Sequence, residues 1–142
     1  MVLSKFKERA GWIITLFAAI LALNSILDGG NSSQILSDTI EANNVWAFYQ
    51  AKSIKQNLTE MRYDDAIARK DLKAAEILKA KIERYESDPK TGEGKKELME
   101  KARAIEADRA VCEQRSPWYT FANALFQIAI VIMAAAMISF SV

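Results

Sequence analysis

The chain has 142 residues, and its 19 Lys and Arg residues nearly balance its 18 Asp and Glu residues, giving a formal net charge of +1. It contains no His, which removes the usual general acid-base side chain, the Ser/His/Asp and Cys/His catalytic arrangements and most zinc sites, and its single Cys excludes an intramolecular disulfide. We therefore expect no catalytic residue, metal ligand or cofactor site, and the charge balance argues against a nucleic-acid partner.

Two apolar runs lie near the ends of the chain, at residues 12–27 and 118–142, and neither contains Asp, Glu, Lys or Arg. A bilayer core of about 30 Å requires about 20 helical residues, a length that the second run reaches. Basic residues precede the first run as in a secretory signal, but no small-residue cleavage site follows it, which favours a retained anchor. We predict transmembrane helices at residues 11–27 and 117–142.

The basic tail at residues 1–10 sets the expected orientation. The tail contains three basic residues, Lys5, Lys7 and Arg9, and one acidic residue, Glu8. The positive-inside rule places such a tail in the cytoplasm. The charged segment between the apolar runs then lies on the other side of the membrane, because segments longer than about 60 residues cross largely regardless of their own charge.

The segment between the apolar runs has a helical pattern, because Gly and Pro occur only at its two ends and in one cluster at residues 89–94. A linker is expected at residues 28–37, after the first span. Asp38 and Glu41 then match a capping box, which predicts that a long helical arm begins there and covers residues 38–87.

A turn at residues 88–92 is expected to stop the long arm. Pro89 disfavours helix in the residue before it, and Gly92 permits turn geometry. A returning arm then covers residues 93–116. The sequence thus predicts an all-α membrane protein, in which two transmembrane helices bracket a charged extramembrane helical hairpin or coiled coil.

Charged residues of both arms are spaced as helical ion pairs. Asp65 and Arg69 lie four residues apart on the long arm. The same spacing separates Lys79 from Glu83 on the long arm and Glu97 from Lys101 on the returning arm. This spacing predicts solvated helix faces and not a surface for nucleic acid.

An apolar stripe follows the long arm at spacings of four and three residues, which is typical of a coiled-coil seam. The long arm is about twice the length of the returning arm, so something else must cover its first half. Either the arm breaks near residues 63–65 and folds back as a three-helix unit, or its apolar face meets a second copy. We favour self-association with some folding back. The stripe consists of Ala47, Ala51, Ile54, Leu58 and Met61.

Three aromatic residues lie within four positions of the long arm. Trp46 and Tyr49 are three residues apart and share one side of a helix, so Phe48 points elsewhere. Packing near the membrane surface and a specific partner site are both open interpretations. The predicted surface for a partner or a second copy consists of Trp46, Phe48, Tyr49, Ala51, Ile54, Leu58 and Met61.

The second apolar run follows Ser116 and Pro117, a helix cap and the residue preferred at the first helical position. Within the run, Asn123 and Gln127 lie four residues apart on one helix face. Polar side chains in lipid hydrogen-bond across helix interfaces, so this pair is predicted to pack against another helix, with the lining of a pore as the alternative. Cys112 is either a buried free thiol or a bridge between two copies.

Residues 46–56, WAFYQAKSIKQ, resemble the signature of a bacterial family of membrane proteins known only as a domain of unknown function. In that family the signature follows a first span and precedes a charged helical region and further spans, a layout similar to that of residues 13–132. The resemblance implies a bacterial inner-membrane protein and supplies no activity, cofactor or catalytic residue. It also implies a basic turn and a third span, whereas this chain ends at Val142 within apolar sequence.

These patterns predict a non-enzymatic, oligomeric inner-membrane scaffold or accessory subunit that acts through helix association. Its N-terminus is cytoplasmic and its central segment periplasmic. Its partners are the lipid bilayer and copies of itself, a larger membrane complex, or both. The alternative is a small oligomeric pore or transporter subunit with Asn123 and Gln127 in its wall, although the absence of charged residues from the second run counts against a transporter of protons or ions.

Overall fold

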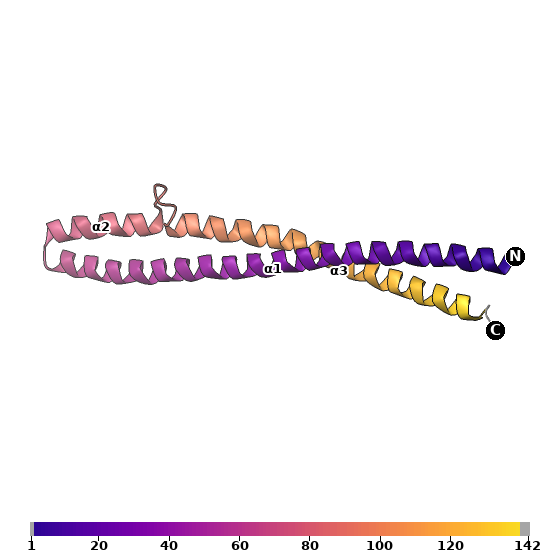
Figure 1. The fold of residues 1–142 in the computed structure, drawn as a ribbon. Helices are drawn as coiled ribbons and strands as arrows, with labels where there is room; N and C mark the ends of the chain where they lie inside the picture. The colour runs from indigo at the N-terminus through magenta and orange to yellow at the C-terminus, as the bar shows by residue number, and fades with distance from the viewer. Residues whose placement is uncertain (1, 140–142) are drawn as a thin grey trace. The chain divides into compact units, whose positions relative to one another are not determined.

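The computed structural model describes residues 2–139, which form three helices, α1 (Val2–Ala68), α2 (Leu72–Glu86) and α3 (Lys95–Ser139) (Figure 1). No strand occurs among these residues, so the prediction of an all-α chain is confirmed. By length and composition, α1 and α3 each contain a stretch apolar enough to cross a membrane. The first residue of the predicted tail and the end of the predicted span at residues 117–142 lie outside the described residues.

The described chain divides into two compact units. The first unit contains residues 2–35 of α1 and residues 110–139 of α3. The second unit, Leu36–Arg109, contains the rest of α1, all of α2 and the first part of α3. Both apolar runs belong to the first unit and most of the charged segment to the second, so the division follows the change in composition along the chain.

α1 continues without a break through residues 28–37, where the sequence predicted a linker and a new helix beginning at Asp38. The structure corrects this boundary. Gly29 and Gly30 each cost about 1 kcal/mol in a helix relative to Ala, but both retain their backbone donors and neither has a positive φ. Because no proline interrupts α1, the helix accommodates both glycines.

α3 likewise passes through Pro117, which the sequence placed at the start of a separate helix. The expected boundary between a returning arm and a span is therefore not a helix boundary. Proline removes one backbone donor from the helix. The carbonyl that loses this donor is that of Glu113, one turn earlier, and the helix continues on both sides of the proline.

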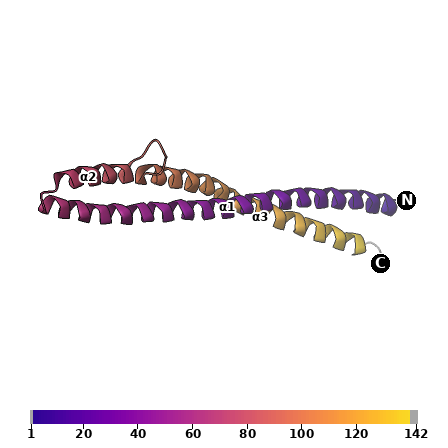
Figure 2. The ribbon, with the colours of Figure 1, turned by 60° about the vertical axis from the view of Figure 1, so that its left-hand side comes forward.

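α2 folds back along α1, and the chain reverses at residues 69–71 (Figure 1). The sequence predicted a break near residues 63–65 or a single reversal at 88–92. Instead, residues 87–94 form a loop at the side of the unit, and α3 continues beyond it in the direction of α2 (Figure 2). α2 and the first part of α3 therefore follow one another along residues 36–68 of α1, which the returning arm alone is too short to cover.

The reversal between α1 and α2 is built on a lysine in the left-handed conformation. Lys70 has a φ of 59°, and its amide donates to the Ile67 carbonyl at 3.0 Å while the Asp71 amide donates to the Ala66 carbonyl at 2.9 Å. These two bonds define a Schellman motif. Asp71 then caps α2, because its side chain accepts a hydrogen bond from the Ala74 amide at 3.0 Å. Neither Gly nor Pro marks this turn in the sequence.

Lys70→Gly is expected to stabilise the protein by about 0.5–1 kcal/mol, because glycine adopts a positive φ without the steric cost that a side chain incurs. Lys79→Gly, at an exposed position inside α2, is the control and is expected to destabilise by about 1 kcal/mol. Chemical unfolding in detergent, followed by circular dichroism, measures both free energies. Equal destabilisation by the two variants would contradict the motif.

Candidate functional site

The second unit is held together along one side of α1, which we call the seam. Its buried and half-buried side chains recur every three or four residues, the spacing of a heptad repeat. Small side chains let the helices approach closely, and Ala42 of α1 and Ala102 of α3 are 1% and 0% exposed. On α1 the seam consists of Asp38, Ala42, Val45, Tyr49, Lys52, Gln56, Thr59, Tyr63 and Ala66.

Trp46 and Tyr49, two members of the predicted partner surface, make contacts inside the second unit. Their rings meet edge to face with centroids 5.5 Å apart, and Trp46 Nε1 donates to Glu106 Oε1 of α3 at 2.8 Å. This bond attaches α3 to α1 at a defined position along the seam. The hydrophobic cluster that both rings pack against consists of Val45, Leu98 and Ala102.

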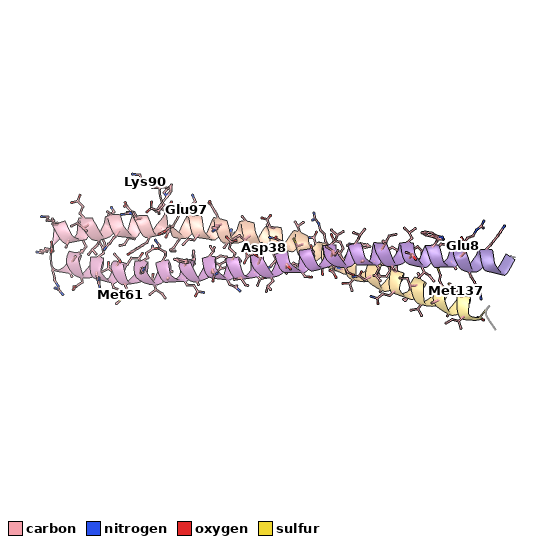
Figure 3. All side chains as sticks on the ribbon, in the orientation of Figure 1. Glu8, Asp38, Met61, Lys90, Glu97 and Met137 are labelled. Carbon is pink, nitrogen blue, oxygen red and sulfur yellow. The ribbon has the colours of Figure 1, made fainter. Side chains whose placement is uncertain are left out.

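The predicted apolar stripe lies on the opposite side of α1. Ile54 is 61% exposed and Met61 is 69% exposed, and Figure 3 shows Met61 on the side of α1 turned away from α2. The side of α1 that packs against α2 and α3 is therefore not the predicted stripe, and the contact of that stripe with a second copy stays a prediction. The true seam includes polar residues such as Gln56 and Thr59, which a search for apolar spacing passes over. We call the exposed face the outer stripe; it consists of Ile40, Ala47, Ala51, Ile54, Leu58 and Met61.

Phe48 borders the outer stripe and is 63% exposed. The structure therefore separates the predicted partner surface into two groups of residues. Trp46 and Tyr49 belong to the interior of the unit, whereas Phe48 and the stripe residues are available at its surface. Ile40 was not among the predicted residues, although it lies seven residues before Ala47 and continues the same spacing.

Glu97 closes the loop between α2 and α3. One of its carboxylate oxygens accepts a hydrogen bond from the Ser87 hydroxyl, and the other accepts from the Asp88 amide at 3.1 Å. The Ser87 hydrogen bond, supported by the Asp88 amide, lowers the pKa of Glu97 below its usual value. A Cβ atom at Gly94 would collide with the Glu97 carboxylate and with the backbone of Ser87 and Asp88, so this close approach requires glycine.

Of the three predicted helical ion pairs, Asp65 with Arg69 is present among the described residues, whereas Lys79 with Glu83 and Glu97 with Lys101 are not. Arg69 Nη2 lies 2.7 Å from Asp65 Oδ2. Glu97 is engaged by the loop, and Lys101, its predicted partner, instead lies 3.1 Å from Glu41 of α1. Because both side chains of that pair are more than half exposed, its contribution to stability is small, typically below about 1 kcal/mol.

Two lysines connect α1 with the segment where α2 ends and α3 begins. Lys95 Nζ lies 3.1 Å from Glu86 Oε2 and 5.8 Å from the centroid of the Tyr49 ring. The Lys95 hydrogen bond lowers the pKa of Glu86. Lys52 Nζ of α1 lies 3.4 Å from Glu93 Oε2 in the loop. The loop is thus held against α1 by charged groups and not by apolar burial.

In the first unit, α1 and α3 meet through an amide pair. Asn24 Nδ2 donates to Asn123 Oδ1 at 2.8 Å and to the Tyr119 carbonyl at 2.9 Å. The rings of Phe17 and Phe126 meet edge to face, with centroids 5.7 Å apart. Asn123 therefore bonds to α1.

Gln127 is exposed, unlike Asn123 four residues before it. Cys112, the other residue singled out from the sequence in this unit, is half-buried with a free thiol, and its carbonyl accepts from Asn31 Nδ2 at 2.9 Å. No group of three or more Cys, Asp or Glu side chains able to hold a metal ion occurs within residues 2–139.

Most apolar side chains of the first unit face outward. In the most apolar stretch of α1, 6% of the residues are buried within the molecule, and in that of α3 the share is 0%. Trp12 and Trp118, which open the two apolar runs, are both exposed. The first unit thus presents apolar side chains at its surface and encloses few of them.

The chain belongs to the family described as Domain of unknown function (DUF4337), whose profile matches residues 6–141. The match covers both units and includes the seam, the outer stripe and the amide pair. No curated protein and no solved structure matches the chain. The family description names no activity, so a function has to be argued from these surfaces.

A double-mutant cycle of Asn24→Ala and Asn123→Ala is expected to give a coupling free energy of about 0.6 kcal/mol and no more than about 1.7 kcal/mol, the range for hydrogen bonds between membrane helices. The control cycle pairs Asn24→Ala with Gln127→Ala, for which we expect a coupling near zero. Unfolding in detergent provides the four free energies of each cycle. Equal coupling in both cycles would argue against the amide pair.

The lowered pKa of Glu97 predicts a fold that is sensitive to acid. A carboxyl group whose pKa is lower in the folded than in the unfolded state stabilises the fold at neutral pH, and this contribution disappears as the pH falls below the ordinary value of 4.5 and through the folded-state pKa. Glu97→Gln should therefore lower the unfolding temperature at about pH 7 and differ less from the wild type at about pH 3. Glu76→Gln, at an exposed position of α2, is the control. A deficit independent of pH would refute this role.

Proposed function

We propose that this chain is a non-enzymatic scaffold or accessory subunit of the bacterial inner membrane. The apolar stretches of the first unit anchor it in the bilayer, and the second unit acts through helix association. The observation that carries the proposal is the outward-facing apolar surface of the first unit. In the most apolar stretch of α1, 6% of the residues are buried within the molecule, and in that of α3 the share is 0%.

Water is a poor solvent for such a surface. Burial of apolar area is favourable by roughly 25 cal/mol per Å², and the helix of a soluble core obtains this by facing the protein interior. The first unit provides no such interior for side chains such as Trp12 and Trp118. Lipid supplies the missing apolar environment, and a continuous helix satisfies its own backbone groups there. Tryptophans at the ends of both runs suit the boundary between hydrocarbon and headgroups.

The second unit supports a role in association. Charged side chains predominate on the exposed surface of α2 and the loop, where Leu72 and Ile77 are also exposed, and α1 carries the outer stripe and Phe48 at the surface. A contiguous exposed apolar surface rimmed by polar residues is typical of a protein interaction site. The basic tail favours a cytoplasmic N-terminus, which assigns the second unit to the periplasm.

A pore built from several copies is the alternative, and it requires water along the membrane face of α3. The amide of Asn123 is engaged by Asn24, which leaves Gln127 as the exposed polar side chain for a pore wall. Accessibility of position 127 to aqueous reagents therefore separates the two functions.

Single cysteines in a Cys112→Ser background test anchoring, orientation and the pore together. In intact cells, an impermeant maleimide should label Lys79→Cys. Lys5→Cys should react only after the membrane is opened, and Gln127→Cys in neither condition, because lipid excludes the reagent. Mass-tag gels measure each labelled fraction.

Fractionation without detergent is the control for the labelling experiment, and the chain is expected in the membrane pellet. Recovery of the chain as a soluble monomer would overturn the anchoring. Full labelling of Gln127→Cys would favour the pore, and exchanged reactivities of positions 5 and 79 would reverse the orientation.

A further inference from the structure

Within the second unit, α1 carries two heptad stripes on opposite sides. The seam faces α2 and α3, while the outer stripe repeats the same spacing of three and four residues over residues 40–61 and faces away from them. A helix whose partners lie only on one side has polar residues on the other. The outer stripe instead carries Ile54, Leu58 and Met61, all more than half exposed.

We propose that the outer stripe is the contact face of a parallel homodimer, in which the outer stripe of a second copy packs against it in register. The inference rests on the scaffold function proposed above and names its partner and geometry. In heptad positions, Ile40, Ala47, Ile54 and Met61 occupy d, and Asn44, Ala51 and Leu58 occupy a.

The size of the face suits a dimer. Residues 40–61 span about three heptads and about 33 Å of helix, which is long enough for a coiled coil to be recognised. Five large apolar side chains along this face are available toward the roughly 800 Å² that one partner contributes to a standard interface. These side chains are Ile40, Phe48, Ile54, Leu58 and Met61, each more than half exposed.

The flanking residues are compatible with a second copy in parallel. In a parallel coiled coil, a residue at position g faces the residue at position e five places later in the partner. Gln50 then meets Lys55, and Asn57 meets Arg62, so each cation faces an amide oxygen. All four side chains are exposed within one chain. No two like charges face one another over this stretch.

Asn44 argues for the direction and register of the pairing. A single Asn at position a is the device by which coiled coils specify register and oligomer state. In register and in parallel, Asn44 meets the same residue of the second copy and can hydrogen-bond to it, whereas antiparallel pairing places it against an apolar d residue, Met61 or Ile54 according to the register. The next a position, Asp65, is paired with Arg69 at 2.7 Å within its own chain, so the interface ends at Met61.

Membrane anchoring favours the same direction. Two copies that enter one bilayer in the same orientation both leave it shortly before Leu36, the first residue of the second unit. Residues 40–61 then begin the same number of residues after the membrane span in both copies, which suits pairing in register. The second copy is therefore the occupant for which direction, flanking charges and Asn44 agree.

Disulfide cross-linking in native membranes tests the inference. In the Cys112→Ser background, Ala47→Cys, Ile54→Cys and Met61→Cys are each oxidised, and each should give a same-site dimer because facing d positions bring Cα atoms within about 7 Å. Lys79→Cys, on exposed α2, is the matched control and should remain monomeric. Positions 47 and 61 are about 21 Å apart along the helix. A same-site disulfide at each of the two positions therefore requires parallel pairing in register.

Leu58→Asp provides a second measurement, because Leu58 is exposed in the single chain and its replacement should abolish the dimer while helical circular dichroism is retained. Cross-linking at Ile54→Cys alone, together with a mixed link between Ala47→Cys and Leu58→Cys, would show antiparallel pairing and overturn the inference. Absence of every cross-link with an oligomeric native mass in mild detergent would reject this face and leave the scaffold function standing. If no cross-link forms and the native mass is that of one chain without partners, both the dimer face and the scaffold function are rejected.

Discussion

The close approach of α2 and α3 to α1 is the constraint on which the second unit depends. Four alanines, Ala42, Ala66, Ala75 and Ala102, are buried, and their size brings the helix backbones near one another. Such a seam removes little apolar area from water per turn, so its hydrophobic stabilisation is modest. Directional contacts, such as the bond from Trp46 to Glu106, then define how the helices align.

In both units small side chains are buried while many large apolar side chains are exposed. In the second unit Ala42 is buried while Ile54 is exposed, and in the first unit Ala10 is buried while Trp12 is exposed. This arrangement is expected of a chain whose large apolar residues meet something other than itself. In the proposed function, lipid covers those of the first unit and a second copy covers the outer stripe.

The all-α fold, the two apolar stretches and the Asp65–Arg69 ion pair were predictable, because each follows from residues close together in the chain. The reversal at Lys70 was not predictable, since it depends on a left-handed lysine where turn patterns require Gly or Asn. The predicted linker failed for the opposite reason. Its glycines are tolerated inside α1, which continues as a helix before and after them.

The sequence by itself determined where helix is favoured and which stretches avoid water, because propensity and hydrophobicity act on neighbouring residues. Only the tertiary structure decided which side of α1 packs against α2 and α3. Both sides repeat every three or four residues, so spacing cannot distinguish them. The side with Ala42 and Thr59 packs against α2 and α3, whereas the side with the larger Leu58 is exposed, because small side chains let the helices approach closely.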